Sequence, residues 1–176
     1  ISLLLAVTGL YNLNKVGSQL ESVSNVDIPL LDSITNITFY ASSINALTDE
    51  NVKISERLAL PSNKLKGFEF ARIGPKDGND YIGGNFASAV NISTTLPMFL
   101  ESMDTADISY FVDFGNVWGV DYSSSVDDSN LIRSSTGVQV NWFTPIGPLN
   151  FSLAHPLNKA TTDKTQAFQF NLGTTF

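Results

Sequence analysis

The chain of 176 residues lacks cysteine entirely and contains one histidine and two methionines. Without cysteine, disulfide scaffolds and thiolate metal sites are excluded. Basic residues are scarce, with ten lysines and arginines against seventeen aspartates and glutamates. The resulting net charge of -7 and the pI near 4.4 argue against a nucleic-acid partner. Long apolar runs are missing too, because a membrane-spanning helix needs about 20 apolar residues and the best candidate is the short segment 1–10. The length corresponds to roughly one domain, and the mean hydropathy of the chain is average, at +0.06.

Catalytic chemistry has little support in the sequence. A nucleophile needs an oriented base, and the single His155 shares a strand face with Phe151 and Leu153, which favours a bystander at an interface. Segment 126–130 lacks the ligand number and spacing of a calcium loop, and segment 74–78 lacks the Gly-Lys-Ser/Thr of a phosphate loop. We therefore expect a protein that is not an enzyme and that carries no metal or cofactor.

Residues 1–34 have the apolar spacing of a helix, three or four residues apart. Pro29 disfavours helix at Ile28, so a break is expected there. Segments 6–16 and 25–31 resemble the start of the sensor bundle of bacterial chemoreceptors, which implies a sensor fragment as one alternative. We expect 1–35 to be a helical lead-in that need not belong to the rest, and 36–176 to be a separate domain. The chain starts without Met or a basic stretch, so we expect a mature chain or a fragment.

From about Asn36 onward the apolar period becomes two, which indicates β-strands. Turn residues divide this part into seven predicted strands: Asn36–Ala46, Val52–Leu60, Asn85–Leu96, Asp107–Trp118, Leu131–Phe143, Leu149–Pro156 and Ala167–Phe176. Most are near the 9–11 residues that cross a bilayer as a tilted strand. Their connections alternate between short (47–51, 97–106, 144–148) and longer or more polar (61–84, 119–130, 157–166). Such alternation is typical of outer-membrane barrels.

The two faces of the predicted strands differ in polarity. One face of the fourth strand carries Ile108, Tyr110, Val112, Phe114 and Trp118, and the other carries Asp107, Ser109, Phe111, Asp113 and Gly115. In the next strand Thr136, Val138, Val140 and Trp142 oppose Arg133, Ser135, Gly137, Gln139 and Asn141. A soluble β-sandwich would also alternate. The polar second face and the tryptophans near strand ends favour lipid outside and a lumen inside. Val52–Leu60 fits less well, because Glu56 falls on its apolar face.

Seven segments carry a family resemblance, in order: 52–58, 65–70, 73–77, 81–85, 111–118, 145–149 and the C-terminal strand. From about Phe39 to Phe176 the chain resembles the C-terminal part of the barrel in the bacterial surface antigen family, which includes the barrel subunit of the outer-membrane protein assembly machinery. The resemblance implies an all-β fold: the last seven of sixteen strands of an antiparallel outer-membrane barrel. Seven strands cannot close a barrel alone.

The same resemblance implies a function. It implies an assembly factor in the outer membrane of a Gram-negative bacterium, which folds and inserts β-barrel proteins through a lateral gate. The partners would be outer-membrane lipid, unfolded barrel clients and periplasmic assembly lipoproteins. The alternative within the superfamily is a pore or a polypeptide-secretion transporter.

The resemblance also implies candidate site residues. The family's long loop folds into the lumen, and its tip matches Leu65, Lys66, Gly67 and Phe68. Lys66 stands where the family has arginine, and its expected inner-wall partners are Asp113 and Phe111. Lysine keeps the charge but loses the planar fork, so the contact should be weaker or less directional. The alternative is that Lys66 and Asp113 are unpaired residues in a polar lumen.

The last strand is the expected gate strand. The candidate gate residues within it are Phe168, Phe170, Leu172, Gly173 and Phe176. Alternation gives it one apolar face, and Gly173 should weaken its pairing locally.

Overall fold

The structure is a computed structural model that describes residues 34–47, 51–96, 105–123, 126, 131–145 and 147–173. The predicted helical lead-in, except for its last two residues, and Phe176 lie outside the described residues. Thr35–Phe176 forms one compact unit. The predicted boundary between 35 and 36 stays a prediction.

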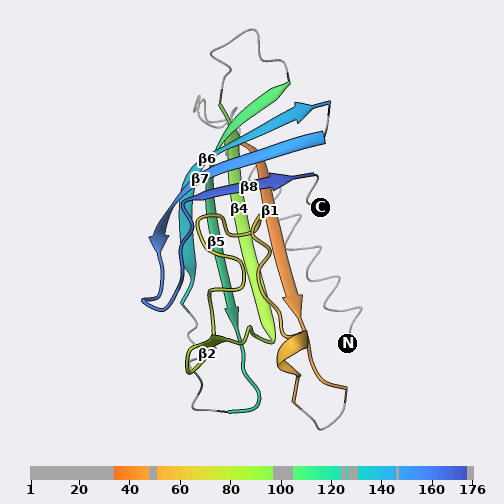
Figure 1. Cartoon of the computed structure of the whole chain (residues 1–176), viewed down its shortest axis with the longest axis vertical. Helices are drawn as coiled ribbons and strands as arrows, with labels where there is room; N and C mark the ends of the chain where they lie inside the picture. Colours follow the sequence, from red (N-terminus) through yellow and green to blue (C-terminus); the bar gives the residue numbers. More distant parts are fainter. Residues whose placement is uncertain are drawn as a thin grey trace, which may run out of the picture. The chain divides into compact units, whose positions relative to one another are not determined.

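Six strands form one sheet in chain order (Figure 1). They are β1 (Ile34–Ser43), β4 (Phe86–Thr95), β5 (Ala106–Trp118), β6 (Arg133–Thr144), β7 (Gly147–Asn158) and β8 (Phe168–Leu172). Every neighbouring pair from β4 to β8 is antiparallel. A tight turn joins β6 to β7, where Thr144 pairs with Gly147. The predicted all-β, partial antiparallel barrel is confirmed.

The predicted strand Val52–Leu60 is wrong. This segment contains the short 3-10 helix η2 (Ile54–Glu56) and forms an isolated bridge between Leu58 and Gly84, outside the strands of the sheet. The reason is Arg57, whose buried guanidinium turns inward and binds partners far along the chain. Glu56, which fitted badly on a lipid-facing strand, is exposed on η2.

The two faces of the sheet are as the alternation predicted. On β5 the outward Ile108, Tyr110 and Phe114 are exposed, whereas Phe111 and Asp113 are 1% and 0% exposed. Aromatic pairs join neighbouring strands on the outer face: Phe86 stacks on Trp118, and the ring centroids of Phe151 and Phe170 lie 5.1 Å apart. An apolar outer face of this kind suits a lipid surrounding.

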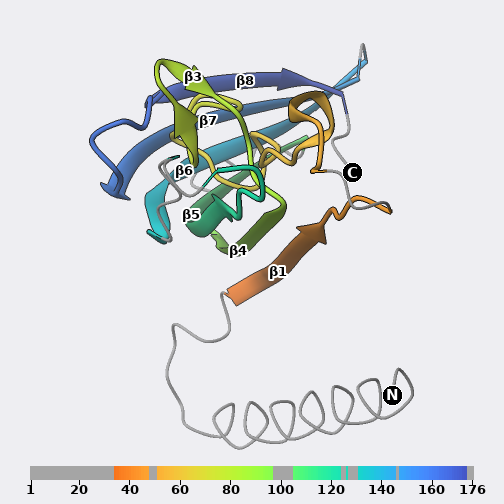
Figure 2. The same ribbon diagram turned by 90° about the horizontal axis from the view of Figure 1, so that it is seen from below.

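Residues 60–73 of the long connection between β1 and β4 lie against the inner face of the sheet. Figure 2 shows β4 to β8 following one another around this connection. It contains the two-stranded hairpin of β2 (Lys76–Asp77) and β3 (Asp80–Tyr81). Its apolar side chains form a core with β4 and β5: Leu60, Leu65, Phe68, Ile73, Ala87, Ala89 and Val117. In the part of the chain that the structure describes, no helix is long and apolar enough to span a bilayer.

Candidate functional site

The site is the contact between the in-turned loop, residues 65–72, and the inner wall of the sheet. Gly67 brings the loop against β6 and β7. Its φ of +90° is unfavourable for other residues, and a Cβ there would lie 3.1 Å from the Ala154 Cβ and 3.4 Å from the Ser135 Cβ. Glycine therefore permits both the turn and the close approach of the backbone to the wall.

Lys66 and Asp113 are in contact. The Lys66 Nζ lies 2.9 Å from the Asp113 Oδ2, and the Lys66 backbone N–H donates to the same oxygen at 3.0 Å. The Lys66 Nζ also lies 4.2 Å from the centroid of the Phe111 ring, a cation–π contact. One fully buried carboxylate thus fixes both the backbone and the side chain of the loop tip. A second anchor through the backbone partly compensates for the fork that lysine lacks.

Asn91 joins this contact and was not among the predicted site residues. Its Nδ2 donates to the Asp113 Oδ1 and to the Lys64 carbonyl oxygen, each at 2.8 Å. Asn91 stands directly opposite Asp113 in the pairing of β4 with β5. Alternation along the strand indicates that Asn91 faces inward. Its partner Asp113 becomes visible only from the pairing register of β4 with β5.

The other tip residues are apolar anchors. Leu65 and Phe68 are each 2% exposed and belong to the core shared with β4 and β5. The structure therefore brings together all four predicted tip residues and both wall residues. Their functional role stays a prediction.

A second ion pair, between the buried Arg57 and the partly exposed Asp121, fixes another part of the connection. Arg57 donates to Asp121, to the Asn85 Oδ1 at 2.9 Å and to the Val52 carbonyl oxygen at 3.0 Å. Asp121 follows β5 and accepts from the Val52 N–H and the Asn85 amide, each at 3.0 Å. Hydrogen bonds from the Val52 N–H, then from Asn85 and Arg57, hold the pKa of Asp121 well below its usual value. Spacing within the sequence gave no signal for this pair.

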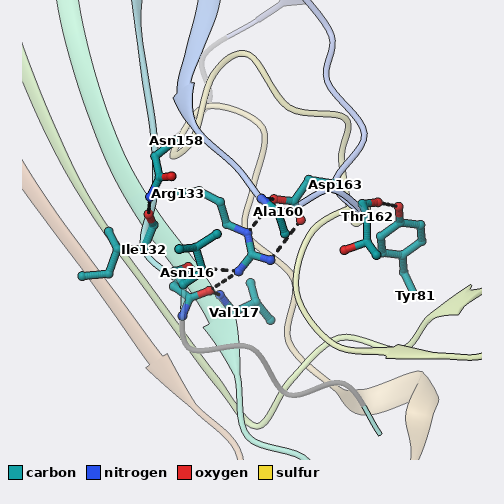
Figure 3. A network of polar contacts seen from close by, with 10 residues as sticks. Tyr81, Asn116, Val117, Ile132, Arg133, Asn158, Ala160, Thr162 and Asp163 are labelled. Atoms are coloured by element: carbon teal, nitrogen blue, oxygen red, sulfur yellow. Dashed lines mark hydrogen bonds and ion pairs between the residues drawn. The ribbon is translucent and has the colours of Figure 1, made fainter.

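A third ion pair joins β6 to the connection between β7 and β8 (Figure 3). The Arg133 Nε and Nη2 each lie 2.9 Å from an Asp163 oxygen, and Nη1 donates to Asn116 and to the Leu131 carbonyl oxygen. The Arg133 side chain is 1% exposed. Alternation had placed Arg133 inward, but nothing in the sequence named its partner.

The last strand has the predicted apolar outer face. Phe168, Phe170 and Leu172 are 52%, 51% and 64% exposed. Its inward Gln169 is buried and donates from Nε2 to the Phe68 carbonyl oxygen at 2.8 Å, so the strand touches the in-turned loop. Gly173 follows the strand at φ +100° and still donates to the Pro148 carbonyl oxygen at 2.9 Å.

A polar cavity of about 590 Å³ lies on the inner face beside the loop tip. Lys66, Phe111 and Asp113 line it together with amides and hydroxyls of β4 to β8. Asn141 accepts hydrogen bonds from Asn150 and, at 2.8 Å, from Gln139 in its wall. Within the described ranges, no three His, Asp or Glu side chains gather as metal ligands would.

The comparisons with known proteins agree on one family. The Omp85 superfamily domain matches residues 13–176. The chain is 34% identical over 139 residues to the outer membrane protein assembly factor BamA of Neisseria meningitidis, covering 64% of this chain and 17% of that protein. It is 29% identical over 147 residues to BamA of Neorickettsia risticii, covering 82% and 20%. The chain thus spans about a fifth of the length of these relatives.

A solved structure shows the same fold. The crystal structure of BamA from Haemophilus ducreyi lacking POTRA domains 1–3 superposes with a TM-score of 0.55 at 32% identity, covering 62% of this chain and 25% of that chain.

Proposed function

Because this chain belongs to the Omp85 superfamily, we propose that it forms the C-terminal barrel part of an outer-membrane protein assembly factor. The protein works in the outer membrane of a Gram-negative bacterium, where it folds and inserts β-barrel proteins. The similarity to two BamA proteins supports this role. The observation that carries it is the in-turned loop docked on the inner wall, with Lys66 on Asp113.

The mechanism depends on an unpaired strand edge. In the described sheet β8 has a strand neighbour on one side, β7. Unpaired backbone groups cost several kcal/mol each in lipid, so a client strand that pairs with this edge gains stability by β-augmentation. The free edge of β8 acts as one side of a lateral gate, and the docked loop keeps the adjoining wall in shape. Unfolded barrel proteins are the clients, and periplasmic lipoproteins assist their delivery.

Client folding in vesicles tests the proposal. The full-length protein is reconstituted in phosphatidylcholine vesicles, a urea-denatured small barrel protein is added, and its folding is followed by heat-modifiable gel migration. We expect faster client folding than in empty vesicles and a slower rate with Lys66→Met. The matched control is Lys159→Met, which removes an exposed cation.

Equal client folding with and without the protein would overturn the proposal. Steady ion conductance without client folding would indicate a pore, and client recovered inside the vesicles would indicate a secretion transporter.

A further inference from the structure

The connection between β7 and β8 is paired to the in-turned loop through its backbone. Phe68 and Thr165 form an isolated antiparallel bridge. Around it, the Glu69 N–H donates to the Lys164 carbonyl oxygen and the Gln166 N–H donates to the Gly67 carbonyl oxygen, each at 3.0 Å. The Lys164 N–H in turn donates to the Arg72 carbonyl oxygen at 3.1 Å. Residues 163–166, which we call the docking strip, therefore form backbone hydrogen bonds with the loop much as a neighbouring antiparallel strand would.

The docking strip is short and leads directly into the last strand. The Ala154 N–H donates to the Ala167 carbonyl oxygen at 2.8 Å, which fixes the residue that follows the strip to β7. Two residues later, Gln169 donates to the Phe68 carbonyl oxygen at 2.8 Å. The loop thus contacts both the docking strip and the beginning of β8.

One buried arginine binds the first residue of the docking strip. Asp163, its first residue, accepts from the Arg133 Nε and Nη2 on its two oxygens, a bidentate pairing with fixed direction. The Ala160 N–H donates to the Asp163 Oδ2 at 2.6 Å and turns the connection back on itself. On its other side Arg133 is held by Asn116 (Figure 3). It also donates to the Leu131 carbonyl oxygen.

The burial of this pair supports a positioning role. Both side chains are almost fully inaccessible, 1% for Arg133 and 0% for Asp163. A charge removed from water in this way is costly unless its donors are satisfied. The Arg133 donors face a carboxylate, an amide oxygen and a carbonyl oxygen, so the guanidinium is stable in one orientation only.

We propose that Arg133 is the positioning residue of a second anchor for the in-turned loop, the docking strip 163–166. The first anchor, Lys66 on Asp113, holds the loop to β5. The second holds it to the beginning of β8, so loop docking and the start of the last strand are coupled. The consequence of this coupling for client assembly rests on the proposed function; the coupling itself does not.

A cysteine pair measures the coupling directly. Glu69→Cys and Lys164→Cys replace residues whose backbones are hydrogen-bonded, and the chain contains no cysteine of its own. The rate of disulfide formation is measured by gel shift in the full-length protein in membranes after addition of an oxidant. Arg133→Met and Asp163→Asn should each slow it at least about fivefold. Lys159→Met, the loss of an exposed cation in the same connection, should leave it unchanged.

Two further variants sharpen the test. Arg133→Lys keeps the charge but cannot span both Asp163 oxygens, so its rate should fall between the native and Arg133→Met rates. Heat-modifiable migration of each variant reports whether the barrel is folded, so that rates are compared between folded proteins.

Two results would overturn the inference. One is a native disulfide rate in Arg133→Met. The other is a slow rate in Arg133→Met with a native rate in Asp163→Asn, which would mean that Arg133 acts through Asn116 and not through the docking strip. Client folding is measured separately in the same variants, so a failure of the proposed function leaves the disulfide result intact.

Discussion

The outer and inner faces of the sheet are built by different rules. On the outer face, residues meet their partners on adjacent strands, as Phe151 meets Phe170. On the inner face, the decisive contacts join strands to connections far away in the sequence, as Asp113 meets Lys66 and Gln169 meets Phe68. The outer face needs only the right residue class at every second position, whereas the inner face needs specific partners. The effect of a substitution should therefore depend on depth in the bilayer on the outer face, and on the loss of a specific partner on the inner face.

The largest effect is expected at Asp113. Asp113→Asn would leave the buried Lys66 ammonium without its countercharge, and breaking a buried pair in this way costs about 3–5 kcal/mol. The measurement is the free energy of unfolding by urea of the full-length protein in vesicles. The control is Asp107→Asn, an exposed acid on the same strand, for which a change within about 0.5 kcal/mol is expected.

Charge reversal tests the pair itself. Lys66→Asp or Asp113→Lys alone should impair the protein, and the two together should restore part of the loss. No restoration would mean that the contact does not depend on opposite charge, and the contrast between the faces would weaken.

On the outer face, the destabilisation caused by a charged substitution should depend on its depth in the bilayer. Val112→Arg places a charge at the middle of β5, where about 2–4 kcal/mol of destabilisation is expected in lipid, whereas Ile108→Arg near its end should cost only about 0–1 kcal/mol. Unfolding in vesicles, followed by tryptophan fluorescence, measures both. Equal costs at the two positions would argue against a lipid-facing surface.

The same contrast explains what the sequence could and could not predict. Period-two alternation placed Asp113 and Arg133 inward and Phe114 outward, because a strand alone determines which side a residue faces. It failed at Val52–Leu60, since the inward turn of Arg57 depends on Asp121, 64 residues away. A charged residue on an inward face needs a partner, but only the folded chain shows which one.

The resemblance supplied one partner that alternation could not. It paired Lys66 with Asp113, and the structure places these side chains 2.9 Å apart. It offered nothing for Arg133 or Asp163, whose pairing depends on the path of the connection between β7 and β8. Buried ion pairs outside the recognised motif therefore had to come from the structure.

A smaller effect is expected from crowding at the loop tip. Gly67→Ala adds a methyl group 3.1 Å from the Ala154 Cβ at a positive φ, whereas Gly78→Ala has a positive φ but nothing within 4 Å. Both variants suffer backbone strain. The crowding should make Gly67→Ala about 1–3 kcal/mol more destabilising than Gly78→Ala in the same unfolding measurement. If the two variants are equally stable, the loop does not press closely on β6 and β7.

The smallest effect is expected in the pH dependence of the unfolding free energy, through the ion pair of Arg57 with Asp121. Hydrogen bonds from the Val52 N–H, Asn85 and Arg57 lower the pKa of Asp121 in the folded protein, so its ionised form stabilises the fold. This contribution is complete above the unfolded pKa of about 4 and is lost as the pH falls toward the lowered folded value. The unfolding free energies of the native protein and Asp121→Asn should therefore differ at pH 7 and converge below about pH 4. A gap that stays constant down to pH 2 would mean that the Asp121 carboxylate does not anchor the connection.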